Sequence, residues 1–222
     1  MPKTDSLIYT NTHFDKSAAR LSQCPTDIER EVAFAGRSNA GKSSALNCLT
    51  GNKKLARTSK TPGRTQLINF FRLGDSPLAL VDLPGYGYAK VPVAKKNEWQ
   101  KELGFYLDKR EPLVGLVLLM DIRHPLKEFD VAMLDWATQA NMPVHVLLTK
   151  ADKLKRGPAQ AALLQVKKAL KSYNTPMTAQ TFSSQSGDGL KILQQTLNAW
   201  LLADNDDNDD DFIPPLPDHL LD

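Results

Sequence analysis

Residues 36–43 read G-R-S-N-A-G-K-S, a spacing of glycine, lysine and serine that is typical of a phosphate-binding loop. An apolar run at 32–35 precedes it and a helix-like stretch at 43–49 follows it, which is the context that such a loop needs. Glycines let backbone N–H groups close on phosphate oxygens, and a helix N-terminus adds positive potential. Lys42 would then reach the β- and γ-phosphates, and the Ser43 hydroxyl would bind Mg²⁺.

A second motif, Asp82-Leu83-Pro84-Gly85, follows the apolar run at 78–81. An Asp at the end of a strand can hold Mg²⁺, and the Gly85 N–H can meet a γ-phosphate. Alone this pattern is more often a turn, but its position after a phosphate-binding loop favours a nucleotide site.

A third motif, Thr149-Lys150-Ala151-Asp152, follows the apolar run at 144–148 and predicts recognition of guanine. The Asp152 carboxylate can accept hydrogen bonds from N1–H and the 2-amino group of guanine, whereas adenine has no such amine and presents a lone pair at N1. An unpaired buried charge is costly, so the carboxylate would discriminate against adenine. The Lys150 stem can lie against the base. Backbone N–H groups at Phe182-Ser183-Ser184 could meet guanine O6.

A polar segment, residues 51–65, separates the first motif from the second and predicts a mobile loop. A GTPase needs a threonine there whose hydroxyl reaches Mg²⁺ and whose backbone senses the γ-phosphate. Thr58, Thr61 and Thr65 are all eligible, and the pattern does not choose among them.

The elements that position these motifs alternate along the chain. Apolar runs predict strands at 31–35, 66–73, 78–82, 113–121, 144–149 and 178–183; helical patterns lie at 42–49, 93–109, 127–141, 158–173 and 190–202. The turn at 74–77 is too short for a parallel connection. We therefore expect an α/β three-layer P-loop NTPase fold: a mostly parallel six-stranded sheet, one antiparallel edge strand, and helices on both faces.

The 222 residues suit one domain with short extensions: an N-terminal extension at 1–26, the G domain at 27–203 and a disordered acidic tail at 204–222. The net charge of +3 hides an asymmetry. Residues 203–222 hold eight Asp and no Lys or Arg, which leaves 28 basic and 17 acidic residues, or +11, in residues 1–202. This suits an anionic partner such as RNA, or it is a solvated basic surface.

The remaining composition excludes several classes. No apolar run is long enough to cross a membrane, and the N-terminus lacks the pattern of a signal peptide. Cys24 and Cys48 are read as reduced thiols, and neither they nor the four histidines have the spacing of a zinc site. We expect a cytoplasmic monomer without a membrane or DNA partner.

Together these motifs resemble the TRAFAC-class GTPases, and among them the EngB family of bacterial GTP-binding proteins. The resemblance rests on residues 31–44, 61–66, 69–71, 82–89 and 149–152, and it covers about 23–203. It implies that Thr65 is the threonine that binds Mg²⁺, with Ser43 and Asp82. It implies a GTP/GDP site made of Gly36, Arg37, Ser38, Asn39, Ala40, Gly41, Lys42, Ser43, Gly63, Arg64, Thr65, Gln66, Leu67, Asp82, Leu83, Pro84, Gly85, Thr149, Lys150, Ala151, Asp152, Phe182, Ser183 and Ser184.

The resemblance also implies a role in assembling the large ribosomal subunit and in normal cell division and septation. Composition indicates neither role, although a basic body is compatible with rRNA. Seven cations lie in or beside the expected switch loops and are candidate contacts to the phosphates of an rRNA partner: Lys53, Lys54, Arg57, Lys60, Lys90, Lys95 and Lys96. We consider an ATP-using metabolic kinase, a membrane-linked G domain and a G domain fused to RNA-modifying chemistry as rivals; the sequence favours none of them.

Catalysis is expected to be slow, and to depend on Lys42, Thr65 and Asn39. Tyr86 follows Gly85, where Ras-like proteins place a glutamine that orients the attacking water, and a phenol cannot replace that amide. Asn39 resembles the asparagine that holds an activating K⁺ in related GTPases, where the cation would neutralise charge between the β- and γ-phosphates. It is equally explained as a residue favoured in turns.

Overall fold

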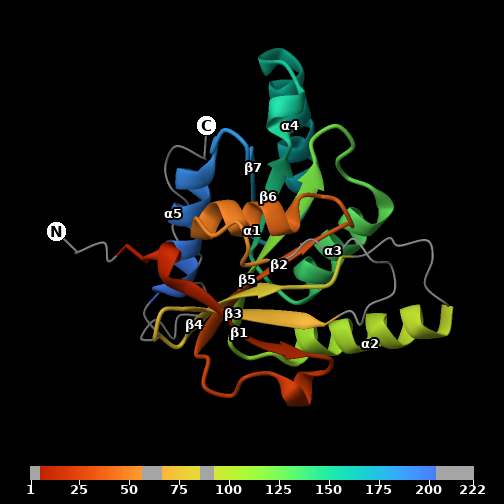
Figure 1. The fold of residues 1–222 in the computed structure, drawn as a ribbon. Helices are drawn as coiled ribbons and strands as arrows, with labels where there is room; N and C mark the ends of the chain where they lie inside the picture. The colour runs from red at the N-terminus through yellow and green to blue at the C-terminus, as the bar shows by residue number, and fades with distance from the viewer. Residues whose placement is uncertain (1–5, 57–66, 86–92, 204–222) are drawn as a thin grey trace.

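The computed structural model describes residues 6–56, 67–85 and 93–203 (Figure 1). Its strands are β1 (Thr12–Ala18), β2 (Arg30–Gly36), β3 (Ile68–Leu73), β4 (Leu78–Asp82), β5 (Leu113–Asp121), β6 (Val144–Thr149) and β7 (Met177–Thr181). Its helices are α1 (Lys42–Thr50), α2 (Val93–Lys109), α3 (Glu128–Gln139), α4 (Arg156–Leu170) and α5 (Leu190–Leu201). Three short 3₁₀ turns, η1 (Tyr9–Asn11), η2 (Leu21–Gln23) and η3 (Ala151–Lys153), complete the described elements.

All seven strands form one mixed sheet in the order β1-β3-β4-β2-β5-β6-β7. The strands β4, β2, β5, β6 and β7 are parallel, whereas β3 is antiparallel to both β4 and β1. The predicted fold class and the antiparallel β3–β4 pair are confirmed. The predicted strand count of six is wrong, and so is the expectation that one antiparallel strand forms the edge, because β1 lies outside β3.

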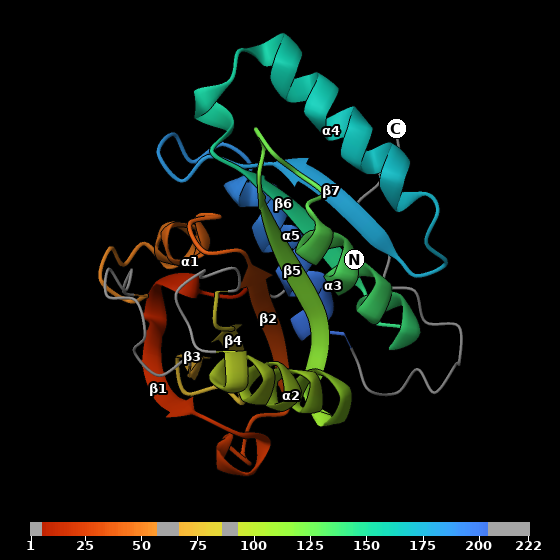
Figure 2. The same ribbon diagram turned by 90° about the vertical axis from the view of Figure 1, so that its right-hand side faces the viewer.

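The helices cover both faces of the sheet. On one face α2, α3 and α4 pack against alternate strand residues such as Ala33 and Leu116, and on the other α1 and α5 pack against Phe34 and Val117 (Figure 2). Because the central strands are covered on both sides, their sequences are mostly apolar, with the buried His145 as an exception in β6. This explains why the sequence revealed them clearly.

The parallel strands bring all the predicted motifs to one edge of the sheet. The phosphate loop follows β2, the Asp82–Gly85 motif follows β4, the guanine motif follows β6, and Phe182–Ser184 follows β7. We call this the carboxyl edge, and the opposite side, where β2 and β6 begin, the amino edge. Ligands of open α/β sheets bind at the carboxyl edge.

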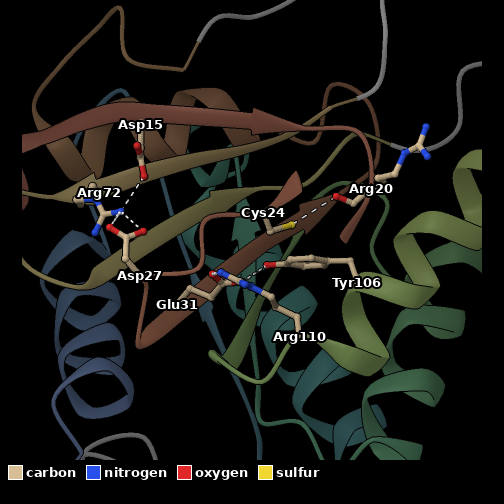
Figure 3. Close-up of polar contacts among 8 residues, drawn as sticks. All are labelled: Asp15, Arg20, Cys24, Asp27, Glu31, Arg72, Tyr106 and Arg110. Atoms are coloured by element: carbon tan, nitrogen blue, oxygen red, sulfur yellow. Dashed lines mark hydrogen bonds and ion pairs between the residues drawn. The ribbon is translucent and has the colours of Figure 1, made fainter. Parts of the chain in front are cut away.

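A buried polar cluster holds the amino edge together (Figure 3). The fully buried carboxylate of Glu31 accepts a hydrogen bond of 2.6 Å from the Tyr106 hydroxyl and two from Arg110, at 3.0 and 2.8 Å. The Arg110 guanidinium also lies 5.6 Å from the centre of the Phe70 ring. The cluster therefore fixes the end of α2 to β2 and β3.

Several predicted segments lie outside the described residues. They are most of the mobile loop, including Thr58, Thr61, Gly63, Arg64, Thr65 and Gln66, together with Tyr86 and the acidic tail. The boundaries of the described helices differ modestly from the predicted ones: α4 begins two residues earlier, at Arg156, and ends at Leu170.

Candidate functional site

The phosphate loop joins β2 to α1 through a tight left-handed turn. Asn39 has φ of +66° and Gly41 has φ of +95°, and Gly41 directly precedes the first residue of α1. A Cβ on Gly41 would stand 3.4 Å from the Thr149 hydroxyl, so glycine suits both the conformation and the space. Successive N–H groups in such a turn, continued by a helix N-terminus, form a concavity that can bind an anion.

Lys42 forms an ion pair with Asp82, which connects α1 to the end of β4. Both side chains are 11% exposed, so the pair is nearly buried but opens to the site. Ser43 follows Lys42 in the first turn of α1 and is half-buried. A cation, a carboxylate and a hydroxyl thus lie together where a phosphate and a divalent metal ion would meet.

Gly85 approaches the phosphate loop closely. A Cβ added there would lie 3.3 Å from the Ser38 hydroxyl oxygen. That oxygen is buried, and among the described residues it has no hydrogen-bond partner. Buried polar atoms normally have partners, so an unsatisfied hydroxyl at this place fits a site that takes a polar ligand.

A pocket of about 200 Å³ opens beside the phosphate loop. It is lined by Gly41, Ser44, Thr149, Lys150, Asp152, Lys153, Phe182, Ser184 and Gln185. The Ser183 hydroxyl, which is fully buried, donates a hydrogen bond of 2.8 Å to Asp152 Oδ1, and Lys153 Nζ lies 3.0 Å from Oδ2. These contacts, with that of Lys153 the stronger, lower the pKa of the Asp152 carboxyl, so the pocket presents an ionised acceptor.

Thr149 and Lys150 connect the pocket to the phosphate loop. The Thr149 hydroxyl donates to the Ala40 carbonyl. Lys150, in a left-handed conformation with φ of +60°, donates to the Asn39 carbonyl at 2.6 Å and to Asp121 Oδ2 at 2.9 Å. Arg123 and then Lys150 hold the pKa of the Asp121 carboxyl well below its usual range. The strand ends and the loop therefore form one rigid unit.

The structure brings the described members of the predicted site together at the carboxyl edge. The phosphate loop, Asp82–Gly85, Thr149–Asp152 and Phe182–Ser184 all meet there. Leu67 is half-buried at the same edge, because β3 runs antiparallel and its Asn69 pairs with Asp82. Sequence reasoning missed the side chains of Ser183, Asp121 and Lys153. Asp121 carried a usable signal because, like Asp82, it ends an apolar strand.

Comparison with known proteins decides the family. Residues 31–150 match a family model described as "50S ribosome-binding GTPase". The chain is 56% identical over 195 residues to the probable GTP-binding protein EngB of Escherichia coli O139:H28, an alignment that covers 88% of this chain and 92% of that protein. The chain belongs to the EngB family of GTP-binding proteins. The corresponding protein of Shigella boydii serotype 18 gives the same identity and coverage.

Solved structures agree with the EngB-family fold. A crystal structure of a probable GTP-binding protein engB superposes with a TM-score of 0.63 at 23% identity, covering 78% of this chain and 98% of that one. The structure of a variant of Aquifex aeolicus Era bound to GDP·AlF₄⁻ gives 0.60 at 20% identity, covering 84% of this chain and 62% of that one. At such identities the likeness shows the fold alone. Family membership makes this chain a GTP-binding protein of a GTPase family.

Proposed function

We propose that this protein is a slow, Mg²⁺-dependent GTPase switch that acts in assembly of the large ribosomal subunit. The observation that carries the proposal is the Asp152 carboxylate, held ionised by Ser183 and Lys153 in a pocket beside a phosphate loop. Normal cell division and septation would depend on it through the supply of ribosomes. We place the protein in the cytoplasm as a monomer. No helix among its described residues is long and apolar enough to cross a membrane.

The triphosphate is proposed to lie across the N-terminus of α1. There Lys42 would exchange Asp82 for the β- and γ-phosphates, and the unsatisfied Ser38 hydroxyl would gain a partner. Ser43, Asp82 and Thr65 would hold Mg²⁺, Asp82 becoming available as Lys42 turns to the phosphates. Bound Mg²⁺ would neutralise phosphate charge. Asp82 would thus pair with Lys42 in the absence of nucleotide and bind Mg²⁺ in its presence, which would couple metal binding to nucleotide binding.

Guanine is proposed to occupy the pocket against the Lys150 stem. Asp152 would accept from N1–H and the 2-amino group, and Ser183 would keep its carboxylate aimed at them. An adenine base would set its N1 lone pair against this carboxylate and offer no 2-amino group to it, which would cost several kcal/mol relative to guanine. The proposed switch follows from the same site, since residues 57–66 and 86–92 flank it in sequence and an rRNA-containing partner would read their nucleotide-dependent arrangement.

Slow hydrolysis follows from Tyr86, which offers no amide to orient water. Activation by K⁺ at Asn39 is a separate hypothesis. The positive φ of Asn39 is a conformation that asparagine tolerates, which favours the turn explanation without a cation. Hydrolysis rates measured in K⁺ and in Na⁺, with and without large subunits, decide between them; equal rates would remove the K⁺ hypothesis.

Exchange of the base specificity tests the proposed function. Asp152→Asn would prefer xanthine, whose C2 carbonyl accepts a hydrogen bond where guanine donates one. We expect the wild-type protein to sediment with large ribosomal subunits in the presence of a non-hydrolysable GTP analogue and less with GDP. The variant should require the xanthosine analogue instead.

Two outcomes would contradict the proposal. If Asp152→Asn keeps full affinity for GTP, the base-binding assignment is wrong. If the wild-type protein binds GTP but associates equally with subunits in every nucleotide state, the switch is wrong. Ser186→Ala, an exposed change in the same loop, is the matched control and should leave nucleotide preference unchanged.

A further inference from the structure

The surface of α4 carries a single sign of charge. Residues 153–175 contain six Lys or Arg and no Asp or Glu. We define the α4 surface by five of these cations: Lys155, Arg156, Lys167, Lys168 and Lys171. Lys153 is left out because it lines the nucleotide pocket. In the part of the chain that the structure describes, none of the five has a carboxylate within ion-pair distance.

The packing of α4 turns this charge outward. Val166 and Leu170 are buried against the sheet, and both ribbon views place α4 at the β7 side of the molecule (Figures 1 and 2). The opposite, exposed side follows a helical spacing of four, four, four and three residues: Arg156, Gln160, Leu164, Lys168 and Lys171. Arg156, Lys168 and Lys171 therefore share one accessible face with Leu164, which is 57% exposed, and Lys167 beside them is half-buried.

The N-terminus of α4 carries positive charges that destabilise the start of the helix. A helix start favours acidic residues and a side-chain cap because of its positive dipole end. Here Lys155 occupies the N-cap without a side-chain hydrogen bond, Arg156 follows, and the first turn has no acidic residue. Since folding disfavours these cations there, binding is the better explanation for them. At the other end, Lys167 and Lys168 suit the dipole.

The geometry points to a polyanion as the occupant. Arg156 and Lys168 are twelve residues apart, which separates the two cationic ends by roughly 18 Å along a helix. A single small anion cannot span that distance, whereas the phosphates of a nucleic acid can. A membrane is disfavoured because the apolar side of α4 is already buried, leaving Leu164 as its exposed large hydrophobic residue.

We propose that the α4 surface binds the phosphate backbone of RNA and gives the protein an affinity for its ribosomal target that does not depend on the bound nucleotide. This rests on the proposed function for the identity of the target. The cationic C-terminal end belongs to a helix that packs on β7, an edge strand on the other side of the sheet from β3 and β4. The switch would then add nucleotide-dependent contacts to the RNA contacts that the α4 surface makes in every nucleotide state.

Charge removal at each end of α4 tests the proposal in the full-length protein. One variant is Lys167→Gln with Lys168→Gln and Lys171→Gln, and a second is Lys155→Gln with Arg156→Gln; glutamine keeps helix propensity. The matched control changes exposed cations far from α4, Lys16→Gln, Arg20→Gln and Lys109→Gln, and removes the same charge as the triple. Binding is measured to an RNA duplex, to purified large subunits and to anionic phosphatidylserine vesicles, at several salt concentrations.

We expect the triple variant to bind both RNA probes ~10- to 100-fold more weakly and to lose about two to three units of salt slope. The double variant should lose less RNA affinity than the triple. Its melting temperature should be unchanged or raised, because the two cations interact unfavourably with the positive end of the helix dipole. The control should stay near wild type, and all variants should bind GTP as wild type does.

Three results would overturn the proposal: equal losses in the triple variant and the control, no loss in either α4 variant, or preference of the wild type for vesicles over RNA. Failure of the proposed function looks different. In that case the duplex result still depends on α4, but large subunits bind independently of GTP. Conversely, GTP-dependent subunit binding that survives both α4 changes would overturn only the α4 proposal.

Discussion

One ion pair lies near each end of β2, and the two pairs differ in how well they are buried and hydrogen-bonded. At the amino edge, Glu31 is fully buried and its carboxylate accepts three hydrogen bonds, two from Arg110 and one from Tyr106. At the carboxyl edge, Lys42 and Asp82 pair with each other and both side chains remain 11% exposed. The Glu31 carboxylate has all the hydrogen-bond donors that it needs within the protein, so this pair has a structural role. The Lys42–Asp82 contact can be replaced by contacts to a ligand, which is what a binding site requires.

The same division recurs on β6. His145, near its start, is fully buried and both ring nitrogens are engaged, at 2.7 Å from the Thr178 hydroxyl and 2.9 Å from Gln180 Oε1. At its end, Thr149 and Lys150 hold the phosphate loop. One edge of the sheet thus stabilises the fold and the other is available for chemistry. Substitutions at the two edges should separate stability from nucleotide binding.

The largest expected effect is on stability, from Arg110→Met at the amino edge. It leaves the Glu31 carboxylate buried without its counter-ion, and breaking such a pair typically lowers the free energy of unfolding by about 3–5 kcal/mol. Urea denaturation measures the loss. The double variant Glu31→Leu, Arg110→Met is the control and should be less destabilised than the single one, because no unpaired charge remains. A double variant that loses the sum of both single losses would show that the pair is not a coupled unit.

Lys42→Ala at the carboxyl edge should affect binding more than folding. Loss of a charged contact to phosphate in a nearly buried site should weaken GTP binding about 100-fold. The free energy of unfolding should fall less than in Arg110→Met, since the Asp82 side chain is 11% exposed and can be hydrated, whereas that of Glu31 is fully buried. Isothermal titration gives the first quantity and urea denaturation the second. Lys54→Ala, an exposed change, should alter neither. Equal stability losses at Lys42 and Arg110 would remove the distinction between the edges.

A smaller effect concerns pH. Burial lowers the pKa of His145 to about 4 from 6.5, while its contact with Gln180 opposes the shift. The unfolded chain therefore binds the proton first as pH falls, so stability is full above pH 6.5 and is lost between 6.5 and 4. This group alone should lower the free energy of unfolding by about 2 kcal/mol between pH 7 and pH 5. His145→Gln should flatten the dependence of the free energy of unfolding on pH by that amount. A profile parallel to that of the wild type would show that His145 takes up its proton as readily in the folded protein as in the unfolded chain.

Sequence predicted the carboxyl edge far better than the amino edge. Phosphate binding and base recognition use contiguous motifs, and the strands before them are apolar on both faces, so both leave a local pattern. The strand β1 was missed because its central residues are exposed and their polarity does not alternate cleanly; a bulge between Phe14 and Lys16 disturbs the register further. Backbone pairing with β3 forms this strand, and pairing leaves no composition signal.

The bonds that orient the site were also beyond sequence reasoning. Ser183 reaches Asp152 across 31 residues and Lys150 reaches Asn39 across 111. At the opposite edge, Arg110 reaches Glu31 across 79. Such pairs depend on which strand ends become neighbours, and the order of the strands in the sheet decides that. The motifs indicate what the site binds, and the fold determines how rigidly it is held.

Competition binding of GTP, GDP and ATP to the purified protein, with and without Mg²⁺, tests the proposed nucleotide site most directly. We expect that GTP and GDP bind well, that ATP does not compete, and that Mg²⁺ tightens GTP binding in the wild type but not in Ser43→Ala. ATP binding as strong as GTP binding would contradict the role of Asp152 and favour an ATP-using P-loop enzyme.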